Sequence, residues 1–418
     1  MVPNLLKPSQ LGGIPKDWKR VRLSEVMKVR QGLQIAISDR LKEPTSTSKE
    51  YITIQSIKKT DQDREYVEAP SQRVICTKDD VLMTRTGNTG IVVTDVEGAF
   101  HNNFFLMDFD KDKIDKTFLV NYLRSPRVQH LILTKAGAST IPDLNHKDFY
   151  SVEFPLAPVL EQKKIAKILS TWDKAISTTE RLIENSTQQK KALMQQLLTG
   201  KKRLLDESRE QFEGEWEEVK LGSICLKVTD GAHHSPQSVE TGYPMYSVKD
   251  MTSSGFRKNS ARLISKGDFD KLVNQNCKPE LNDILIAKDG SILKYCFVVK
   301  EKVEGVILSS IALLRPNLKK VFPEFIAQYF SQEYVRFFVG KALTSGSGVP
   351  RIVLKDFKGI QIALPSIKEQ QKIATVLTNA DKEIELLEQQ LADLQQEKKA
   401  LMQVLLTGKK RVVVDGEG

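Results

Sequence analysis

The chain has 418 residues, of which 40 % are hydrophobic and 28 % are charged, with a formal net charge of +10. This length fits two modules of roughly 150 residues better than one domain. The sequence shows no apolar run of roughly 18 residues and no secretory leader, so we expect a cytoplasmic protein. The positive charge favours a polyanionic partner, most simply a nucleic acid, although a basic protein without such a partner stays open.

Cysteine and histidine are few and scattered. The cysteines, none of them in a CxxC motif, are Cys76, Cys225, Cys277 and Cys296. The five histidines include the neighbours His233 and His234, which have no partners at metal-ligand spacing. We therefore expect reduced thiols, no disulfide framework and no metal bound by this chain.

The first predicted module covers residues 1–157. It contains the segment WKRVRLSEV from Trp18 and a short apolar strand at residues 81–83, which is followed by the polar loop TRTGNTG. An apolar run bounded by turn residues is typical of a buried strand. The glycines in the loop allow a backbone to approach a ligand closely.

A long helix is predicted next, at residues 158–203. Its seam positions recur at spacings of three and four, as a heptad requires, although three of them are polar. These positions are Ile176, Thr179, Ile183, Ser186, Lys190, Leu193 and Leu197. Gly200 follows as a natural stop, and the basic residues after it suit a helix C-terminus.

The second half of the chain repeats the first. The phrase KKALMQQLLTGKKR at Lys190 returns as KKALMQVLLTGKKR at Lys398, an offset of 208, and 24 of the 43 positions from Glu161 to Arg203 are identical at that offset. The offset is 203 between DDVLMTRTG and NDILIAKDG, and 198 between WKRVRLSEV from Trp18 and WEEVKLGSI from Trp216. The duplication predicts a second module at residues 204–364, a second helix at 365–411 and a tail at 412–418.

The second helix has the stronger seam. Ser366 and Glu369 fit a capping box at its start, and Gly408 fits a stop at its end. Lys398 occupies one seam position, and the others are Ile384, Leu387, Leu391, Leu394, Leu401 and Leu405. An ordinary amphipathic core helix is the alternative, but nearly 40 residues of unbroken periodicity favour a coiled coil.

Duplication also predicts a geometry. Two copies of one unit pack most simply about a pseudo-twofold axis, as homodimers do. Such an axis predicts antiparallel helices with the modules at opposite ends, and register fixed by the seam lysines Lys190 and Lys398. The stretch from Glu161 to Thr199 has 39 residues and is about 58 Å long as a helix, which is long enough to hold two modules against one face of a duplex.

Several motifs occur in both halves: PLAPVLEQKKIAKIL and ALPSIKEQQKIATVL at the helix starts, LLTGKKR at the helix ends, and DVLMTRTGNTG and DILIAKDGS inside the modules. In these motifs the chain resembles the DNA specificity subunit of type I restriction-modification systems, over nearly its whole length. The resemblance implies an α+β fold in which two similar α/β target recognition domains are separated by a long antiparallel two-helix coiled coil. It also implies a non-catalytic chain that reads an asymmetric bipartite site on double-stranded DNA.

Partners follow from the same resemblance. It implies two methyltransferase subunits docked on the repeated helices, together with restriction and translocase subunits. S-adenosylmethionine, ATP and Mg²⁺ are then expected on those partners, and this chain is expected to bind no cofactor.

The loops after the buried strands are the main candidates for DNA contact. The frames of the modules repeat while their interiors differ, which suits the reading of different bases. Arg85 is predicted at a guanine or a phosphate and Asn88 at an adenine. The full set in these loops is Arg85, Thr86, Asn88, Lys288 and Ser291. A structural β-turn is the alternative for each loop.

Further candidates lie elsewhere in the modules. Lys147 and Lys355 hold matching places in the KDF repeats and are predicted to contact phosphates. The loops GAST from Gly137 and SGSG from Ser345 can offer N–H groups to phosphate or serve only as turns. Polar stretches of the divergent interiors add Gln31, Gln34, Gln55, Lys58, His233, His234 and Lys249.

Catalytic motifs are missing from the sequence. It contains no Pro-Pro dipeptide, which the base-holding signature of amino-methyltransferases needs, and no GxxxxGK[ST] phosphate loop. The EEVK segment at Glu217 resembles part of a nuclease motif but aligns with KRVR, so we interpret it as a surface strand. Two alternatives stay open: a coiled-coil scaffold without DNA specificity, whose binding would be indifferent to salt, and part of a fused restriction enzyme.

Overall fold

The computed structural model describes residues 6–7, 13–58, 64–137, 140–343 and 350–414. The chain divides into two compact units, and the boundary between them falls within each of two long helices. The first unit comprises residues 1–180 and 389–418, and the second comprises residues 181–388. Each unit therefore combines one module with the first part of one long helix and the last part of the other.

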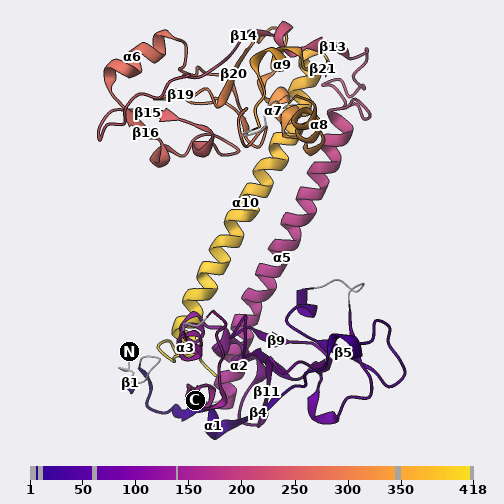
Figure 1. The fold of residues 1–418 in the computed structure, drawn as a ribbon, viewed down its shortest axis with the longest axis vertical. Helices are drawn as coiled ribbons and strands as arrows, with labels where there is room; N and C mark the ends of the chain where they lie inside the picture. Colours follow the sequence, from indigo (N-terminus) through magenta and orange to yellow (C-terminus); the bar gives the residue numbers. More distant parts are fainter. Residues whose placement is uncertain (1–5, 8–12, 59–63, 138–139, 344–349, 415–418) are drawn as a thin grey trace. The chain divides into compact units, whose positions relative to one another are not determined.

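The first module is built on an antiparallel sheet in the order β4-β11-β8-β9 (Figure 1). Its strands are β4 (Met27–Gln31), β11 (Phe104–Phe109), β8 (Val81–Thr84) and β9 (Val92–Thr94). Side chains alternate across β8, because Val81 and Met83 pack in a core with the helices while Leu82 packs in a second core with Phe104. Burial of both faces explains why this strand is apolar without alternation.

Smaller sheets complete the first module. One has the order β6-β5-β10-β7, in which β10 is parallel to β5 and antiparallel to β7. The other pairs are β3 with β12 and β1 with β2. The bounds are β6 (Tyr66–Val67), β5 (Lys49–Ile52), β10 (Gly98–Phe100), β7 (Ile75–Cys76), β3 (Lys19–Arg22), β12 (Glu153–Leu156), β1 (Leu6–Lys7) and β2 (Ile14–Pro15).

Helices of the first module cover one face of its main sheet. The Asp115 carboxylate caps α2 by accepting from the Phe118 N–H at 2.8 Å. Pro126 occupies the first turn of α3, where a backbone N–H would have no acceptor within the helix, so the missing N–H of proline costs nothing. Phe118 and Ile132 from these helices join the core that also holds Val81. The bounds are α1 (Leu23–Val26), α2 (Lys116–Arg124), α3 (Pro126–Ala136) and α4 (His146–Tyr150), with 3₁₀ turns η1 (Ile37–Asp39), η2 (Ser56–Lys58) and η4 (Gln72–Val74).

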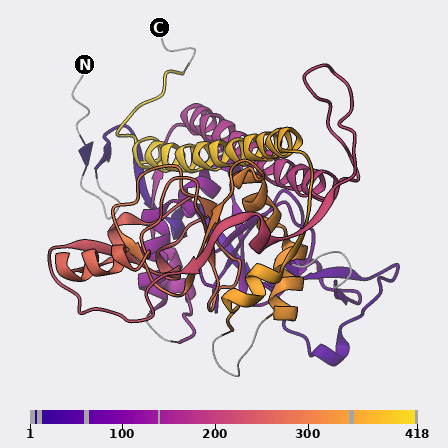
Figure 2. The ribbon, with the colours of Figure 1, turned by 90° about the horizontal axis from the view of Figure 1, so that it is seen from above.

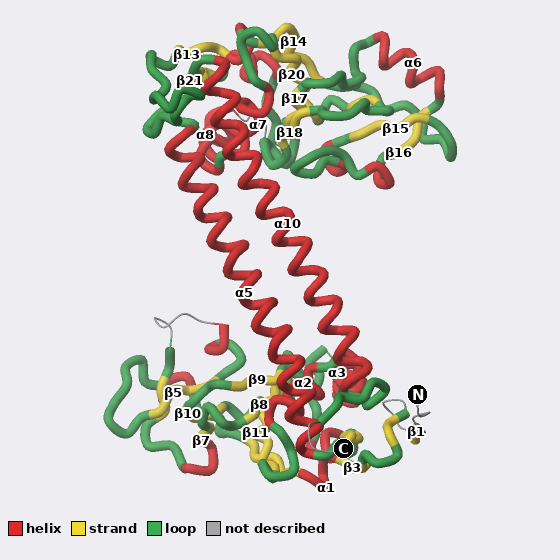
Figure 3. The backbone as a smooth tube through the Cα atoms, turned by 180° about the vertical axis from the view of Figure 1, so that it is seen from behind, coloured by secondary structure: helices red, strands yellow, loops and turns green. Residues whose placement is uncertain are grey.

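The second module repeats this plan with a main sheet in the order β14-β20-β17-β18 (Figure 3). Ile284 and Ile286 of β17 pack in a core with the helices, and Leu285 packs in a second core, as in β8. A second sheet has the order β16-β15-β19. The bounds are β14 (Cys225–Asp230), β20 (Ile311–Pro316), β17 (Ile284–Ala287), β18 (Cys296–Val298), β16 (Arg262–Ile264), β15 (Tyr243–Tyr246) and β19 (Val306–Ile307).

The EEVK segment forms β13, a largely exposed strand that pairs with β21, in agreement with its interpretation as a surface strand. The remaining elements of the module are β13 (Glu217–Lys220), β21 (Gln361–Leu364), α6 (Lys266–Asn274), α7 (Pro323–Ser331), α8 (Glu333–Leu343) and α9 (Leu354–Gly359), with 3₁₀ turns η5 (Leu221–Ser223), η6 (Val248–Asp250) and η7 (Lys258–Ser260).

The two long helices are α5 (Val159–Leu197) and α10 (Ile367–Leu405), each of 39 residues. Figure 2 shows α10, in yellow, as one unbroken helix. Every predicted seam residue of both helices is buried or half-buried, so the heptad pattern marks a packed face. Gly200 and Gly408 have φ angles of 70° and 66°, the left-handed conformation expected at helix stops.

Within each unit the helical segments run antiparallel. In the first unit Lys398 pairs with Asp173, and in the second Lys190 pairs with Asp381 at the equivalent positions. The seam lysines therefore each meet a carboxylate of the other helix. Such polar contacts in an apolar seam favour one register, because any shift leaves a charge unpaired.

A buried ion pair ties the end of one helix to the start of the other in each unit. The Glu161 side chain is 3 % exposed and accepts from Arg411 Nε and Nη2 at 2.7 and 2.8 Å and from Trp18 Nε1 at 2.9 Å. In the second unit the Glu369 side chain, which is not exposed, accepts from Arg203 Nε and Nη2 at 2.6 and 2.7 Å. The LLTGKKR repeats therefore place an arginine on each of these glutamates.

The predicted capping box of α10 forms in part. Ser366 Oγ accepts from the Glu369 N–H at 3.4 Å, as the box requires. The Glu369 carboxylate is engaged by Arg203, a partner 166 positions away that the local motif does not indicate.

All four cysteines are free thiols. Burial raises the pKa of Cys76 to about 11 and that of Cys225 to about 12, which keeps both protonated at neutral pH. Within the described ranges, no helix combines the length and apolar character needed to cross a bilayer.

Candidate nucleic-acid interface

Four segments meet at one end of the main sheet in each module. In the first module, β4 and β8 end and β11 begins at the same edge, because neighbouring strands are antiparallel. The segment before α4 joins them there. We call these meeting points the first loop junction, residues 31–34, 85–90, 101–103 and 142–144, and the second loop junction, residues 230–233, 288–293, 308–310 and 350–352.

Backbone hydrogen bonds hold both junctions. In the first, the N–H groups and their carbonyl acceptors are Arg85 to Asn103 (2.7 Å), Leu144 to Arg85 (2.8 Å), Gly87 to Pro142 (3.1 Å) and Leu33 to Phe100 (3.0 Å). In the second, they are Lys288 to Ser310 (3.0 Å), Ile352 to Lys288 (3.0 Å), Gly290 to Pro350 (2.8 Å) and Ala232 to Ile307 (2.9 Å). The junctions are therefore the same backbone structure built twice.

A glycine at the same place in each junction allows two segments to cross. A Cβ atom at Gly32 would lie 2.0 Å from the carbonyl oxygen of Phe100, and one at Gly231 would lie 2.0 Å from that of Ile307. No side chain can be accommodated at such a distance without moving the backbone. These glycines thus bring the chain after β4 and β14 into the junctions.

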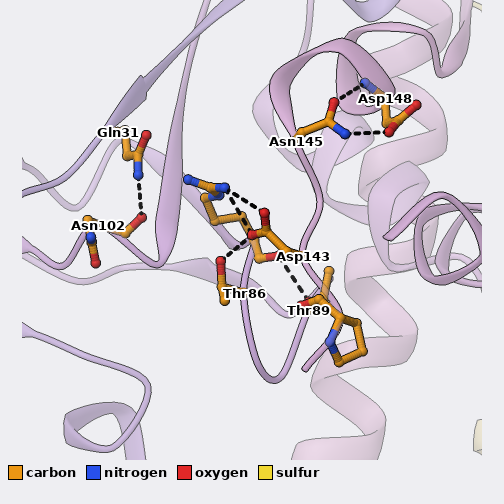
Figure 4. A network of polar contacts seen from close by, with 9 residues as sticks. Gln31, Thr86, Thr89, Asn102, Asp143, Asn145 and Asp148 are labelled. Atoms are coloured by element: carbon orange, nitrogen blue, oxygen red, sulfur yellow. Dashed lines mark hydrogen bonds and ion pairs between the residues drawn. The ribbon is translucent and has the colours of Figure 1, made fainter. Parts of the chain in front are cut away.

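The side chains of the first junction form a network around Asp143 (Figure 4). Arg85 Nη2 donates to both Asp143 carboxylate oxygens at 2.9 Å, and the Thr86 hydroxyl donates to the same carboxylate. The Arg85 guanidinium also lies over the Phe105 ring, 5.5 Å from its centroid. The Arg85 side chain is 17 % exposed and that of Asp143 is 46 % exposed, so the arginine is the inner member of the pair.

Amide groups form the other side of the first junction. Gln31 Nε2 donates to the Asn102 carbonyl at 3.1 Å, and Asn102 Nδ2 donates to Gln34 Oε1 at 2.9 Å. The neighbouring His101 accepts at Nδ1 from the Asn103 N–H at 3.0 Å. Burial lowers the pKa of His101 below its ordinary value, which favours the neutral ring that this bond requires.

The second junction replaces these groups by a series of alternating charges. Lys288 Nζ lies 3.4 Å from Asp230 and 3.1 Å from Asp289, and Arg351 Nε lies 3.8 Å from Asp289. His233 Nε2 lies 3.1 Å from Asp230 at the outer end. The Lys288 side chain is only 6 % exposed, whereas that of Arg351 is 59 % exposed. The inner cation is paired with two carboxylates, and Arg351 faces solvent.

The structure brings several predicted residues into the junctions. Arg85, Thr86 and Gln31 lie in the first network, and Lys288 and His233 lie in the second. Arg85 and Lys288 anchor their loops, because each is paired with carboxylates of its junction. Asn88, Ser291 and His234 are exposed beside these networks.

Other predicted residues lie outside the networks. Lys147 on α4 and Lys355 on α9 are exposed on the helices that directly follow a junction segment. Gln55 and Lys249 are exposed in the divergent interiors. The side chain of Lys58, residues 138–139 of the GAST loop and the SGSG loop lie outside the described residues. Contact of any of these residues with DNA stays a prediction.

Sequence reasoning missed the carboxylates and one of the cations. Asp143, Asp230, Asp289 and Arg351 were not among the candidates, although they complete both networks. A signal was present: Asp143 and Arg351 follow the prolines of IPD and VPR, which align at the offset of 208. At this position of the repeat the first module therefore carries an aspartate and the second an arginine.

The junctions can present polar groups in fixed positions to a ligand. Within the described part of the chain, no group of three or more histidine, cysteine, aspartate or glutamate residues is arranged to hold a metal ion. The groups that face outward are instead amides, hydroxyls, a carboxylate and a guanidinium, which are the donors and acceptors that read base edges and phosphates.

Comparison with known proteins agrees with the repeated architecture. The family model described as type I restriction modification DNA specificity domain matches twice, at residues 15–186 and 213–396. The chain is similar to the type I restriction enzyme MjaVIII specificity subunit of Methanocaldococcus jannaschii, with 25 % identity over 417 residues that cover 96 % of this chain and 94 % of the relative. The putative MjaX specificity subunit of the same organism is 27 % identical over 445 residues, covering 97 % and 96 %.

Solved structures show the same fold. The type I restriction-modification S subunit from M. genitalium superposes with a TM-score of 0.59 at 16 % identity, covering 97 % of each chain. A chain from a structure on complex assembly and conformational transition of the type I R-M system gives 0.55 at 18 % identity, covering 95 % of this chain and 99 % of that one. The predicted α+β class with two similar modules is thereby confirmed.

Proposed function

The chain belongs to the family of type I restriction-modification DNA specificity subunits, and from this premise we propose that each of its two modules reads one half of an asymmetric, bipartite site on double-stranded DNA. The observation that carries the proposal is the repeated loop junction. Its backbone hydrogen bonds are the same in both modules, while its side chains differ at almost every outward position. Such a pair of sites would hold two different sets of donors and acceptors on one scaffold.

The long helices would set the spacing between the half-sites. Each has 39 residues, or about 58 Å at 1.5 Å per residue, and their seams carry equivalent ion pairs in the two units. The same helices would dock two methyltransferase subunits, and restriction and translocase subunits would join the assembly.

Chemistry would come from those partners. The partners would bind S-adenosylmethionine, ATP and Mg²⁺, and this chain would position adenines for flipping into the methyltransferase sites. In this scheme the specificity chain is non-catalytic and acts in the cytoplasm, where the DNA lies.

A module exchange tests the proposal. Residues 30–137 are replaced by the same span of a relative with a different target, and the modified bases are then mapped across the DNA of a host that also carries the cognate methyltransferase. One half of the recognised sequence should change while the other half stays. A change in both halves, or in neither, would contradict the modular account.

The salt dependence of binding separates this function from that of a scaffold. A DNA-reading complex that contacts six to ten phosphates should lose roughly a thousandfold or more in affinity between about 50 and 200 mM salt. A coiled-coil scaffold that joins proteins without meeting DNA would show no binding to the duplex at either concentration.

A further inference from the structure

The two loop junctions have opposite charges at the same backbone position. Asp143 and Arg351 each follow a proline whose carbonyl accepts from a loop glycine, Gly87 in the first junction and Gly290 in the second. Each also forms a backbone bridge to the loop, Asp143 with Thr86 and Arg351 with Asp289. The same position therefore presents a carboxylate in one module and a guanidinium in the other.

Burial separates the side chains of each junction into an inner and an outer group. Arg85, Lys288 and Asp289 are 17 %, 6 % and 14 % exposed, whereas Asp143 and Arg351 are 46 % and 59 % exposed. The inner charges are already engaged: Arg85 with Asp143, and Lys288 with Asp230 and Asp289. The outer charges keep free hydrogen-bonding capacity on the side that faces solvent.

The inner charges also make the outer ones suitable for contact with DNA. A lone carboxylate would be repelled by phosphates, but Asp143 is neutralised by Arg85 and hydrogen-bonded by Thr86. Arg351 lies 3.8 Å from Asp289, a distance that orients its guanidinium without a close ion pair. Each outer group is thus held at the edge of a rigid backbone structure.

We propose that Asp143 and Arg351 are the base-reading residues of the two modules. Arg85 is then the positioning residue for Asp143, and Asp289, itself paired with Lys288, is the positioning residue for Arg351. The proposal rests on the proposed function and names the residues that carry it out. A carboxylate accepts from the exocyclic amine of cytosine, and an arginine donates to both N7 and O6 of guanine. Asp143 then reads a cytosine in one half-site, and Arg351 reads a guanine in the other.

Single substitutions in the complex with the cognate methyltransferase test this. Asp143→Asn keeps the size of the side chain and replaces an acceptor oxygen by an amide NH2 donor, and Arg351→Gln removes the guanidinium. Each should reduce discrimination about 5- to 150-fold at one base position, and the two positions should lie in different half-sites. The readout is the selection of methylated sites from a randomised DNA library.

Matched controls lie beyond the far ends of the same sheets. Asp112→Asn follows β11 and Lys319→Gln follows β20, and both side chains are exposed. Neither control should alter the selected sequence. Because these changes have the same charge effect as the test variants, a shift in both test and control would mean that net charge and not base reading is responsible.

Arg351→Lys distinguishes a base contact from a phosphate contact. Lysine keeps the charge but loses the two parallel N–H donors, so a base-reading role predicts relaxed preference at the same position as in Arg351→Gln. A phosphate contact predicts unchanged preference with slightly weaker binding to all sequences. That second result would overturn the proposal for Arg351.

Failure of the inference and failure of the proposed function give different results. If the wild-type complex selects a bipartite sequence and both Asp143→Asn and Arg351→Gln select the same one, the inference is wrong and the function stands. If the wild-type complex selects no sequence at all, the proposed function itself is wrong.

Discussion

Replacement of Arg411 by alanine should loosen the first unit where α10 returns to the start of α5. Glu161 accepts two hydrogen bonds from Arg411 and one from Trp18, and its side chain is 3 % exposed. The variant leaves a desolvated carboxylate with the indole N–H as its remaining donor in the described structure. Breaking a buried pair in this way costs about 3–5 kcal/mol.

The lower end of that range is expected here. Arg411 is one-third exposed, so water can reach part of the site that the guanidinium vacates. Its second pair, with the half-exposed Asp17, adds no more than about 1 kcal/mol. A loss of about 3 kcal/mol corresponds to roughly a 150-fold fall in the protection of local amides.

Native-state hydrogen exchange measures this locally and needs no two-state unfolding of the whole chain. Arg411→Ala should lower protection at the start of α5 and at β3, and Arg203→Ala should do the same at the start of α10 and at β13. Lys399→Ala, on an exposed face of α10, should change neither. The double variant Arg411→Ala with Glu161→Gln should recover part of the loss, since no unpaired charge remains.

Protection that falls less than fivefold in Arg411→Ala, or equally in both units, would refute the reasoning. The first result would mean that the carboxylate is solvated despite its burial. The second would mean that the substitution unfolds the chain globally, so that the contact could not be treated as local.

Three further predictions concern the helices, the inner charges and pH. Insertion of one heptad after both Glu180 and Glu388 lengthens each helix by about 10.5 Å. Methylation mapping should then show unchanged half-sites separated by a gap that is longer by roughly three base pairs. A gap of unchanged length would contradict the spacing role of the helices. Lys288→Met should weaken binding of the second half-site without changing the preferred bases, measured by competition with half-site mutants, and a changed base preference would show that Lys288 itself reads. Burial lowers the pKa of His101, so its contribution to stability is present above the ordinary pKa of 6.5 and is lost as the pH falls below that value. Amide protection of the first junction, corrected for intrinsic exchange, should therefore decline from pH 7 to 5 in the wild type. It should not decline in His101→Leu, which carries the residue found at the matching position of the second junction, Leu308.

The long helices and buried strands could be predicted because their signals are local and repeated. A heptad seam is written in residues three and four apart, and the observed α5 and α10 lie within the predicted 158–203 and 365–411. The strands β8 and β17 were recognisable from short apolar runs next to glycine-containing loops. Each of these signals is contained in one continuous stretch of the sequence.

The junction networks could not be predicted because their members are distant in sequence. Arg85 and Asp143 are 58 positions apart, and Arg203 and Glu369 are 166 apart. Periodicity carries no information on such pairings. Arg85 and Lys288, predicted from the sequence as DNA contacts, lie in the junctions, but their burial against carboxylates was not foreseen.

Under the proposed function, the repeated backbone of the junctions has a consequence for how the recognised DNA sequence can change. Because N–H and carbonyl groups hold the four segments together, a side chain such as Asp143 can be exchanged for an arginine without loss of those bonds. Each new outer charge nevertheless needs an inner partner of opposite sign, as Arg85 serves Asp143 and Asp289 serves Arg351. Outer and inner residues should therefore change together, and a junction in which only the outer residue is exchanged should bind more weakly than one in which both are.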